Sequence, residues 1–439
     1  MLFKNSEAII DNGQTSELKK IRRDILEIFS AVIDSVDPYK SVKSKLNEKE
    51  VDVSDYKNVY LIGFGKASVG MAKAVCDSIN ISEAVVITNE SNAKINHDNI
   101  SIFQGGHPIP NENSIKGAEK AIGLVKKCDE KDLLIVLISG GGSALLAKPR
   151  VPLEDLQKTT NLLLKSGANI NEINTIRKHL SHVKGGQLVK DAKCKVISLI
   201  ISDIIGDPLG FIASGPTYPD STTYSDSKKI LEKYDLWSKI PNSARNIIED
   251  GISGKIPETA KENNPVFVNV INEIIANNKI ACEAASEKAN ILGYKPIILT
   301  TNLDGEAKEV GKYLVEKTKN YISNGKKIAF ISGGETTVTI KGKGKGGRNQ
   351  EMVLSTIRNL EKEKIVFSSF ATDGIDGICN AAGAIADGFS YSRSIVKKLD
   401  VKKYLDDNNS YEFFSSIEDI FLTGSTGTNV MDIQILIKY

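Results

Sequence analysis

The stretch LLIVLISGGGSALL, residues 133–146, passes from an apolar run through three glycines into a second apolar run. A short apolar run of this kind is typical of a strand that is buried on both faces of a parallel sheet. Glycines at its end allow successive backbone N–H groups to point at one anion. The residues of this turn, Gly140, Gly141, Gly142 and Ser143, are therefore candidates for anion binding. A plain tight turn and a serine nucleophile are the alternative interpretations, although no GxSxG elbow is present.

Similar apolar runs alternate with helical patterns along the chain. They lie at 58–63, 84–88, 101–104, 133–139 and 196–202 in the first half, and at 266–271, 296–300, 328–332, 336–340, 365–370 and 419–423 in the second. Strands that alternate with helices predict parallel sheets covered on both faces. Amphipathic or helical patterns predict helices at 16–46, 174–188, 275–292, 305–322 and 347–360. The alternating segment TTVTI, 336–340, predicts a hairpin at a sheet edge.

The polar segment 250–265 contains Gly and Pro and predicts a linker between two domains. We therefore expect an α/β protein of two three-layer domains. The larger, 1–255, is expected to be a Rossmann-like domain with a parallel sheet, and the smaller, 265–439, to carry a mixed sheet.

The composition restricts the class of protein. Of 439 residues 41% are hydrophobic and 26% charged, and the net charge is +2, so no strong field attracts nucleic acid or an anionic membrane surface, which leaves only local basic patches open. The five cysteines are scattered without a CxxC, which indicates reduced thiols rather than disulfides or a zinc site. With no signal peptide and no membrane-length apolar run, we expect a cytoplasmic protein. The sequence leaves a homo-oligomer open.

The segment GFGKAS, 63–68, follows the first predicted strand and opens a helix. Gly63, Gly65 and Ser68 resemble a dinucleotide fingerprint with serine at the third glycine position, and Glu90 follows the next strand. A lysine at a helix start is unfavourable beside the positive end of the helix dipole, unless an anion lies there too. Lys66 is therefore a candidate for phosphate or carboxylate binding, and a structural turn is the alternative.

Further polar residues follow other predicted strands. His107, in GGHPIPNENS, could orient a substrate, or this segment could be a rigid loop. The basic segment 174–188 contains Arg177, with a substrate-facing helix, a solvated face and a zinc pair of histidines as alternatives. Asp203 and Asp207 follow an apolar strand, where carboxylates can hold magnesium or accept a hydroxyl proton.

The second half repeats this pattern. Gly333, Gly334 and Glu335 follow one strand, Asp373 follows another, and the run KGKGKGGRNQE, 341–351, leads into a helix through Gly347, Arg348 and Asn349. No Walker A motif is present. Many glycine turns beside lysine, arginine and aspartate residues indicate a site for phosphates and a divalent cation, as phosphoryl transfer requires.

These motifs together resemble one family. GFGKAS, GGHPIPNENS, SGGGSALL, INTIRKHLSHVKGG, IASGPTYPD, GGETTVTIKGKGKGGRNQE, TDGIDG and TGSTGTNV are similar to motifs of the glycerate 2-kinases, whose C-terminal part is called the MOFRL domain. The resemblance covers nearly the whole chain. It implies ATP and magnesium as cofactors, glycerate as the substrate, and a site between two α/β domains.

The resemblance also implies roles for three residues. Lys66 corresponds to the lysine of the family's GxGKA motif, Arg348 to the arginine of GGRNQE, and Asp203 to the aspartate of the SD motif. Three segments, 202–210, 373–383 and 423–429, depart from the family's usual pattern, the last with Ser425 in place of proline. An NAD(P)-dependent hydroxypyruvate reductase and a non-catalytic sensor of sugar acids or nucleotides are the alternative functions.

Overall fold

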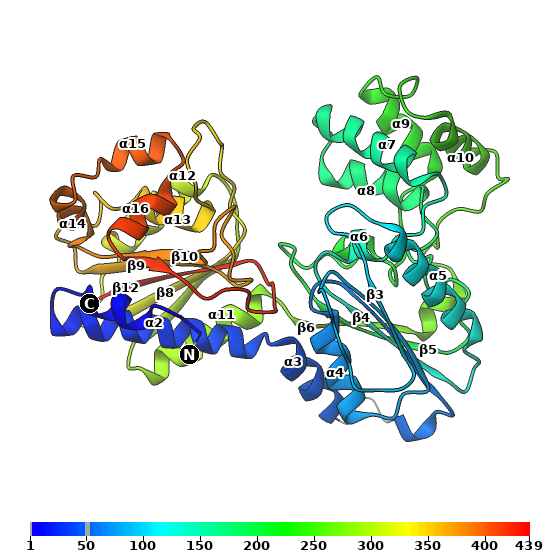
Figure 1. The fold of residues 1–439 in the computed structure, drawn as a ribbon, viewed down its shortest axis with the longest axis horizontal. Helices are drawn as coiled ribbons and strands as arrows, with labels where there is room; N and C mark the ends of the chain where they lie inside the picture. The colour runs from blue at the N-terminus through cyan, green and yellow to red at the C-terminus, as the bar shows by residue number, and fades with distance from the viewer. Residues whose placement is uncertain (1, 49–52) are drawn as a thin grey trace. The chain divides into compact units, whose positions relative to one another are not determined.

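The computed structural model describes residues 2–48 and 53–439 (Figure 1). Contacts between residues divide the chain into two compact units. One consists of 38–202 and 207–275, and the other of 1–37, 203–206 and 276–439. We call them the 38–275 unit and the C-terminal unit. The first helices therefore pack with the second half of the chain. The expected domain boundaries, 1–255 and 265–439, stay a prediction.

The 38–275 unit contains a sheet with the strand order β3-β2-β1-β4-β5-β6. Strands β1, β2, β3, β4 and β5 run parallel, as expected. This order is that of doubly wound nucleotide-binding sheets, which bind ligands at the carboxyl ends of the two strands where the order reverses, here β1 and β4. The bounds are β1 Val59–Phe64, β2 Glu83–Thr88, β3 Ile100–Gln104, β4 Leu133–Ile138, β5 Lys195–Ile201 and β6 Val270–Ala276.

The same unit contains a cluster of helices that strand and helix alternation did not predict. Helices α7, α8, α9 and α10 contact one another and enclose a core of their own that includes Leu163, Ile176 and Tyr224. The helices of the unit are α3 Pro38–Asn47, α4 Ser68–Ser78, α5 Glu112–Lys127, α6 Gly142–Leu145, α7 Leu153–Lys165, α8 Ile170–His179, α9 Tyr224–Lys233 and α10 Asn242–Ile252.

The C-terminal unit contains a mixed sheet, as expected, with the order β11-β10-β9-β12-β8-β7. Strand β12 runs antiparallel to both of its neighbours, β8 and β9, whereas β7 and β8 are parallel. The strands are β7 Lys295–Leu303, β8 Ile328–Gly334, β9 Ile365–Ala371, β10 Gly383–Ala386, β11 Ile420–Phe421 and β12 Asp432–Lys438.

Helices cover both faces of this sheet (Figure 1). Helices α2 and α11 lie on one face, and α12, α13 and α16 lie on the other. The helices of the unit are α1 Ser6–Asp11, α2 Ser16–Ser35, α11 Asn278–Ile291, α12 Ala307–Asn320, α13 Arg348–Leu354, α14 Ser390–Val396, α15 Val401–Asp406 and α16 Ser410–Ser416.

Three expected helices are shorter than predicted. The helix expected at 347–360 ends at Leu354. The helix expected at 16–46 is two helices, because Pro38 lacks the N–H that a continuous helix needs and starts α3 instead. The helix expected at 174–188 ends at His179, and Gly185 and Gly186 adopt left-handed conformations beyond it. The Gln187 side chain donates to the carbonyl oxygens of Lys178, Ser181 and Lys184, which holds this turn together.

Two expected strands are also wrong. The segment 266–271 begins as the 3-10 turn Pro265–Asn269, where the Asn264 side chain accepts from the backbone N–H of Val266, and β6 starts only at Val270. The segment TTVTI forms no hairpin. Thr337 makes a single bridge to Glu306, and both the backbone and the hydroxyl of Thr339 donate to the Glu306 carboxylate. The hydrogen bonds of this segment therefore go to the start of α12 instead of to a strand.

A buried ion network attaches α2 to the C-terminal sheet. Arg22 is 0% exposed and donates to Asp387 at 2.9 and 2.5 Å, to Asp419 at 2.7 Å and to the Ile9 carbonyl at 3.0 Å. Arg393 pairs with the same two aspartates. Although burial opposes ionisation, the guanidinium groups of Arg22 and Arg393 lower the pKa of Asp419. Two arginines therefore compensate two buried carboxylates.

Within residues 2–48 and 53–439, no helix combines the length and apolar character that crossing a bilayer requires.

Replacing Arg22 by methionine should lower the free energy of unfolding by roughly 3–5 kcal/mol, because Asp387 and Asp419 would each lose a buried partner. Urea unfolding followed by circular dichroism measures the change. Lys19→Met in the same helix is the control. Its ion pair with Asp11 is exposed (44% and 73%), so the loss should stay within about 1 kcal/mol. Equal losses in the two variants would contradict the structural role of Arg22.

Candidate functional site at the switch point of the parallel sheet

Two glycine turns meet at the carboxyl ends of β1 and β4. The backbone N–H of Lys66 donates to the Gly140 carbonyl at 2.9 Å, and the N–H of Ala67 donates to the Ser139 hydroxyl at 3.1 Å. The N–H of Ser139 in turn donates to the Phe64 carbonyl at 3.2 Å. The structure thus joins the turn that carries Lys66 to the turn that carries Gly140, Gly141 and Gly142, where a doubly wound sheet binds its ligand.

Gly65 makes this contact sterically possible. Its φ is +123°, and a Cβ atom there would lie 2.1 Å from the Ser139 hydroxyl oxygen. Gly63 and Ser68 serve packing. Gly63 is buried within β1, and the buried Ser68 hydroxyl donates to the carbonyls of Gly65 and Ile87. The serine at the third fingerprint position therefore closes the turn with its side chain.

Lys66 and His107 flank Gly141. A Cβ atom on Gly141 would lie 2.9 Å from Cδ2 of His107 and 3.3 Å from Cγ of Lys66. Both side chains are exposed. Partial desolvation, followed by the charge of Lys66, lowers the pKa of His107, which favours the neutral imidazole. A lysine and a neutral imidazole thus border the left-handed glycine of the turn.

Ser143 lies in a polar cluster that the sequence did not predict. Its hydroxyl is 2.8 Å from that of Ser214, and Ser214 is 3.3 Å from the Asn174 side-chain oxygen. Lys184 donates to the Ser143 carbonyl at 2.5 Å and to its hydroxyl at 3.1 Å. Ser214, Asn174 and Lys184 come from three separate segments. The only sequence signal for Lys184 is its position before the paired glycines of HVKGG.

Lys184 and Arg177 are neighbouring cations in this cluster. Burial, and then the positive charge of Arg177, lowers the pKa of Lys184 well below its usual range, and burial lowers the pKa of Arg177. Lys184 is only 4% exposed. Among the described residues, neither cation forms an ion pair with a carboxylate. Two neighbouring cations without a carboxylate raise the free energy of the folded protein. A ligand that brings negative charge would offset this unfavourable free energy.

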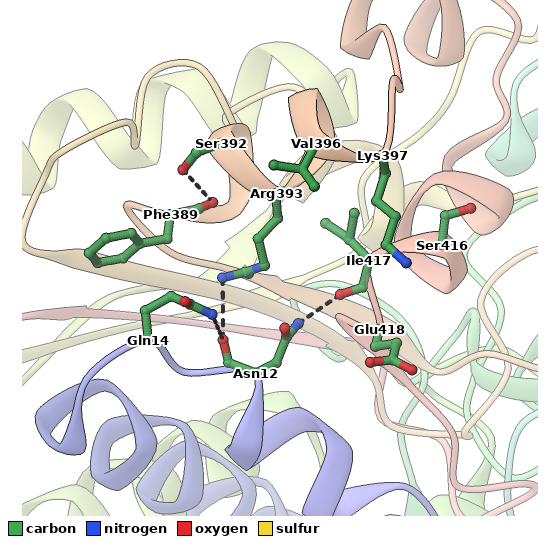
Figure 2. A pocket seen from close by; sticks show the side chains of 10 residues that line it. All are labelled: Asn12, Gln14, Phe389, Ser392, Arg393, Val396, Lys397, Ser416, Ile417 and Glu418. Carbon is green, nitrogen blue, oxygen red and sulfur yellow. Dashed lines mark hydrogen bonds between the residues drawn. The ribbon is translucent and has the colours of Figure 1, made fainter.

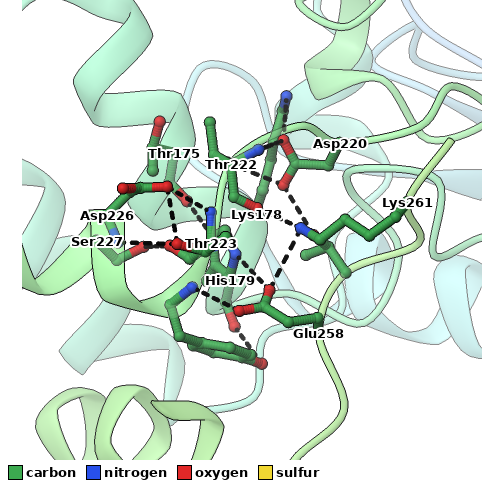
Figure 3. Close-up of polar contacts among 12 residues, drawn as sticks. Thr175, Lys178, His179, Asp220, Thr222, Thr223, Asp226, Ser227, Glu258 and Lys261 are labelled. Atoms are coloured by element: carbon green, nitrogen blue, oxygen red, sulfur yellow. Dashed lines mark hydrogen bonds and ion pairs between the residues drawn. The ribbon is translucent and has the colours of Figure 1, made fainter.

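The other basic residues of this segment have structural partners (Figure 3). Lys178 pairs with the buried Asp220 at 3.2 Å, and His179 lies between the Thr175 carbonyl, at 2.7 Å, and Glu258, at 3.2 Å. The Tyr224 ring also packs edge-on against His179. This network accounts for Lys178 and His179, two of the five basic residues of the segment.

The predicted acidic residues do not form a metal cage. Asp203 and Asp207 lie half-buried after β5, and Asp373 lies half-buried after β9, with its Oδ1 accepting from the N–H of Ile375. The described part of the chain contains no group of three or more His, Cys, Asp or Glu side chains that could hold a metal ion. This finding also removes support from the zinc pair of histidines.

Arg348, in the C-terminal unit, lies between two carboxylates. It makes a bidentate contact with the buried Asp432, at 2.5 and 3.0 Å, and its Nη1 is 2.8 Å from Glu335. Burial raises the pKa of Asp432 to about 6, and Arg348 opposes that rise. Gly333 and Gly334 are close-packed: a Cβ atom there would lie 1.9 Å from the Asn278 side chain and 2.2 Å from the Leu303 backbone, respectively.

The glycine-lysine run before Arg348 is held by neighbouring side chains. Asn408 accepts from the N–H groups of Lys341 and Gly342, Asp407 accepts from that of Lys343, and Asn409 accepts from that of Lys345. These side-chain oxygens accept hydrogen bonds from N–H groups that an anion would otherwise bind. The loop is therefore fixed by its neighbours, and these N–H groups are not available to an anion.

The start of α13 is also capped from within the protein. Asp376 accepts from the N–H groups and side-chain amides of Asn349 and Gln350, at 2.8–3.2 Å. Gly347 allows the approach, since a Cβ atom there would lie 2.3 Å from the Asp376 carboxyl carbon. Asn349 is 0% exposed and also accepts from the Ser369 hydroxyl. The structure thus places Asn349 in the core, where its amide positions α13.

A hollow of about 270 Å³ lies elsewhere in the C-terminal unit. Figure 2 shows residues that line it, among them Asn12, Arg393, Lys397 and Glu418. Its arginine already pairs with Asp387 and Asp419 and so belongs to the ion network of α2.

Gly65→Ala should destabilise the 38–275 unit, because the Cβ atom overlaps Ser139 and the backbone conformation is strained, at a cost of about 1–3 kcal/mol from strain alone. Gly167→Ala is the matched control. It also has a positive φ, +78°, but nothing lies within 4 Å of its Cβ position, so about 1 kcal/mol is expected. Urea midpoints compare the two, and an equal shift would refute the close contact.

Comparison with known proteins agrees with this architecture. Residues 24–249 match a domain of unknown function, DUF4147, and residues 328–432 match the MOFRL family. A glycerate 2-kinase of Pyrococcus horikoshii is 44% identical, with 95% of this chain and 97% of the relative covered. A putative hydroxypyruvate reductase of Agrobacterium vitis is 36% identical, with 95% and 94% covered.

A solved structure shares the fold. The glycerate kinase of Thermotoga maritima is 38% identical, covers 95% of this chain and 99% of its own, and superimposes with a TM-score of 0.87. Matches of this extent and identity, together with the two family domains, show that the chain belongs to the glycerate 2-kinase family with a C-terminal MOFRL domain.

Proposed function

We propose that the protein transfers the γ-phosphoryl group of ATP to the 2-hydroxyl of glycerate, which gives 2-phosphoglycerate and ADP. The observation that carries the proposal is the buried Lys184, which donates to Ser143, with the half-buried Arg177 as a neighbouring cation. A small sugar acid offers a carboxylate for these cations and hydroxyl groups for the polar cluster around Ser143. Its relatives from Pyrococcus horikoshii and Thermotoga maritima are named glycerate kinases, which agrees with this substrate class.

We assign roles as follows. Arg177, Lys184 and Ser143 bind the carboxylate and a hydroxyl of glycerate. Lys66 lies in the neighbouring turn, where its backbone N–H donates to the Gly140 carbonyl. Its side chain compensates the negative charge of the phosphoryl group during transfer. His107, neutral beside Lys66, orients the substrate. Asp203 orients or deprotonates the attacking hydroxyl, and Arg348 supplies further positive charge.

The residues are compatible with a nucleotide and magnesium. The exposed Lys66 side chain, next to Gly141, offers its ammonium group to a phosphate. Magnesium commonly takes only one or two protein carboxylates and completes its shell with water and substrate phosphates, so the lack of a three-residue cluster among the described residues fits this use. Asp203 and Asp207 are the candidate ligands. When bound, the ion would neutralise phosphate charge.

The reductase function has weaker support. The strand order suits a dinucleotide, and a relative carries that name. However, Ser68 fills the third glycine position with a buried side chain. Purified protein with glycerate, ATP and magnesium should yield 2-phosphoglycerate, identified by phosphorus NMR. NADH oxidation with hydroxypyruvate but no phosphoglycerate would favour the reductase, and no product in either assay would favour a sensor.

Lys66→Met should lower kcat by roughly 10²- to 10³-fold, since the variant loses charge stabilisation in the transition state. Stability should hardly change, because the Lys66 side chain is exposed and none of the described residues forms an ion pair with it. Lys73→Met, at an exposed position of the adjacent α4, is the control and should keep wild-type turnover. Full activity of Lys66→Met would refute its role. Arg348→Ala is a poorer test, because it would also leave Asp432 without its buried partner.

The KM for glycerate should rise as the pH rises. Burial and Arg177 lower the pKa of free Lys184, and a bound carboxylate favours the ammonium form, so binding takes up a proton. Binding should therefore weaken above the lowered pKa of the free protein and below about 10.5, the usual lysine value. Steady-state kinetics across this range measure it. In Lys184→Met the KM should be high, and this part of its pH dependence should vanish. An unchanged profile would remove Lys184 from the site.

A further inference from the structure

The C-terminal unit contains a second cavity, lined in part by Arg348. It has a volume of about 430 Å³, within the range of small-ligand sites. Its lining includes Val338, Ile340, Ile378, Arg348, Glu351 and Asn408. All of these residues belong to segments next to the glycine-lysine loop, 341–347. Hydrogen bonds hold this loop in place, so the wall of the cavity is well ordered.

Glu351 supplies a hydrogen-bond acceptor to the cavity. It is only 3% exposed, and its Oε2 accepts from the Asn408 amide at 2.9 Å. Its other oxygen, Oε1, is buried, and no donor among the described residues lies within hydrogen-bond distance of it. Burial raises the pKa of Glu351. An oriented carboxyl group with one buried, unused acceptor calls for a ligand that brings an N–H or O–H group.

The apolar wall provides the second feature. Ile340 is 78% exposed and Ile378 is 80% exposed, although both line the cavity. Exposed isoleucines at the mouth of a pocket fit the flat apolar face of a ligand. Glycerate has no such face, and it is too small to span a cavity of this size.

Arg348, one helical turn before Glu351 in α13, provides the third feature. Its guanidinium lines the same cavity, and the side chain keeps 30% of its surface exposed despite the contacts with Asp432 and Glu335. A ligand that suits this lining has a donor for Glu351, an apolar face for the isoleucines, and negative charge for Arg348. A nucleoside phosphate has all three.

We propose that this cavity binds the nucleoside part of ATP, with the base against Ile340 and Ile378, a donor of the base or ribose on Glu351 Oε1, and the phosphates leading toward Arg348. The inference rests on the proposed kinase function and specifies where its nucleotide binds. Asn408 sets the direction of the free oxygen, because it occupies the other one.

Two variants test the cavity. Glu351→Gln keeps the shape but, with its amide oxygen facing Asn408, presents an N–H group where the ligand needs an acceptor. Ile378→Ser removes apolar wall at an exposed position and should not affect folding. Each should raise the Kd for MgATP, measured by titration calorimetry without glycerate, by roughly tenfold. Ile322→Ser is the matched control, since Ile322 is also 80% exposed but lies outside the cavity lining. It should bind like the wild type.

Analogues identify the donor. Wild-type protein should lose affinity either for 2′-deoxy-ATP or for purine riboside triphosphate, and Glu351→Gln should no longer distinguish that analogue from ATP. If both variants bind MgATP as tightly as wild type, while the wild-type enzyme forms 2-phosphoglycerate, the cavity inference is wrong and the kinase function stands. If the wild type neither binds MgATP nor forms product, both the cavity inference and the proposed kinase function are wrong.

Discussion

The candidate site depends on one close backbone contact, where Gly65 packs against Ser139 at the end of the parallel sheet. The contact is possible because Gly65 has no Cβ atom and adopts a φ that other residues rarely tolerate. It brings the N–H of Lys66 onto the Gly140 carbonyl. The lysine of the first turn and the glycines of the fourth strand thereby share one surface. The strand order places this contact where the chain reverses direction across the sheet, which is the ligand position of doubly wound folds.

Buried cations occur in two different settings in this protein. Arg22 is fully buried, but Asp387 and Asp419 compensate its charge, so the network serves to attach α2 to the sheet. Lys184 is buried and the half-buried Arg177 lies beside it; neither pairs with a carboxylate among the described residues, and the pKa of each falls. Since burial of an unpaired charge is unfavourable, the first arrangement is complete without a ligand and the second is not. This difference separates structural from functional charge more clearly than residue type does.

The glycine-lysine run shows how composition alone misleads. Its glycines and lysines are typical of a mobile anion-binding loop, but Asp407, Asn408 and Asn409 occupy its N–H groups. The glycines are needed for close packing instead: a Cβ atom on Gly342 or Gly344 would lie 2.3 Å or less from the Asp407–Asn409 turn. The loop thereby forms a wall of the cavity that Glu351 and Arg348 line. The loop shapes the cavity, whereas the charged side chains of Arg348 and Glu351 come from α13, the helix that follows it.

The sequence by itself determined the α/β class, the five parallel strands of the first half, the mixed second sheet and the turn that carries Lys66, because apolar runs and glycines are local signals. It did not determine that TTVTI bonds to the start of α12, that Pro38 divides the first helix, or that Asn349 belongs to the core. Only the tertiary structure decided which charges are compensated. Lys178 and Lys184 stand six residues apart in one basic segment, yet one pairs with Asp220 and the other lies beside Arg177 and Ser143. The reason is physical: a charge is stabilised or destabilised by groups that are near in space, and the residues that surround Lys184 come from segments far apart in the chain.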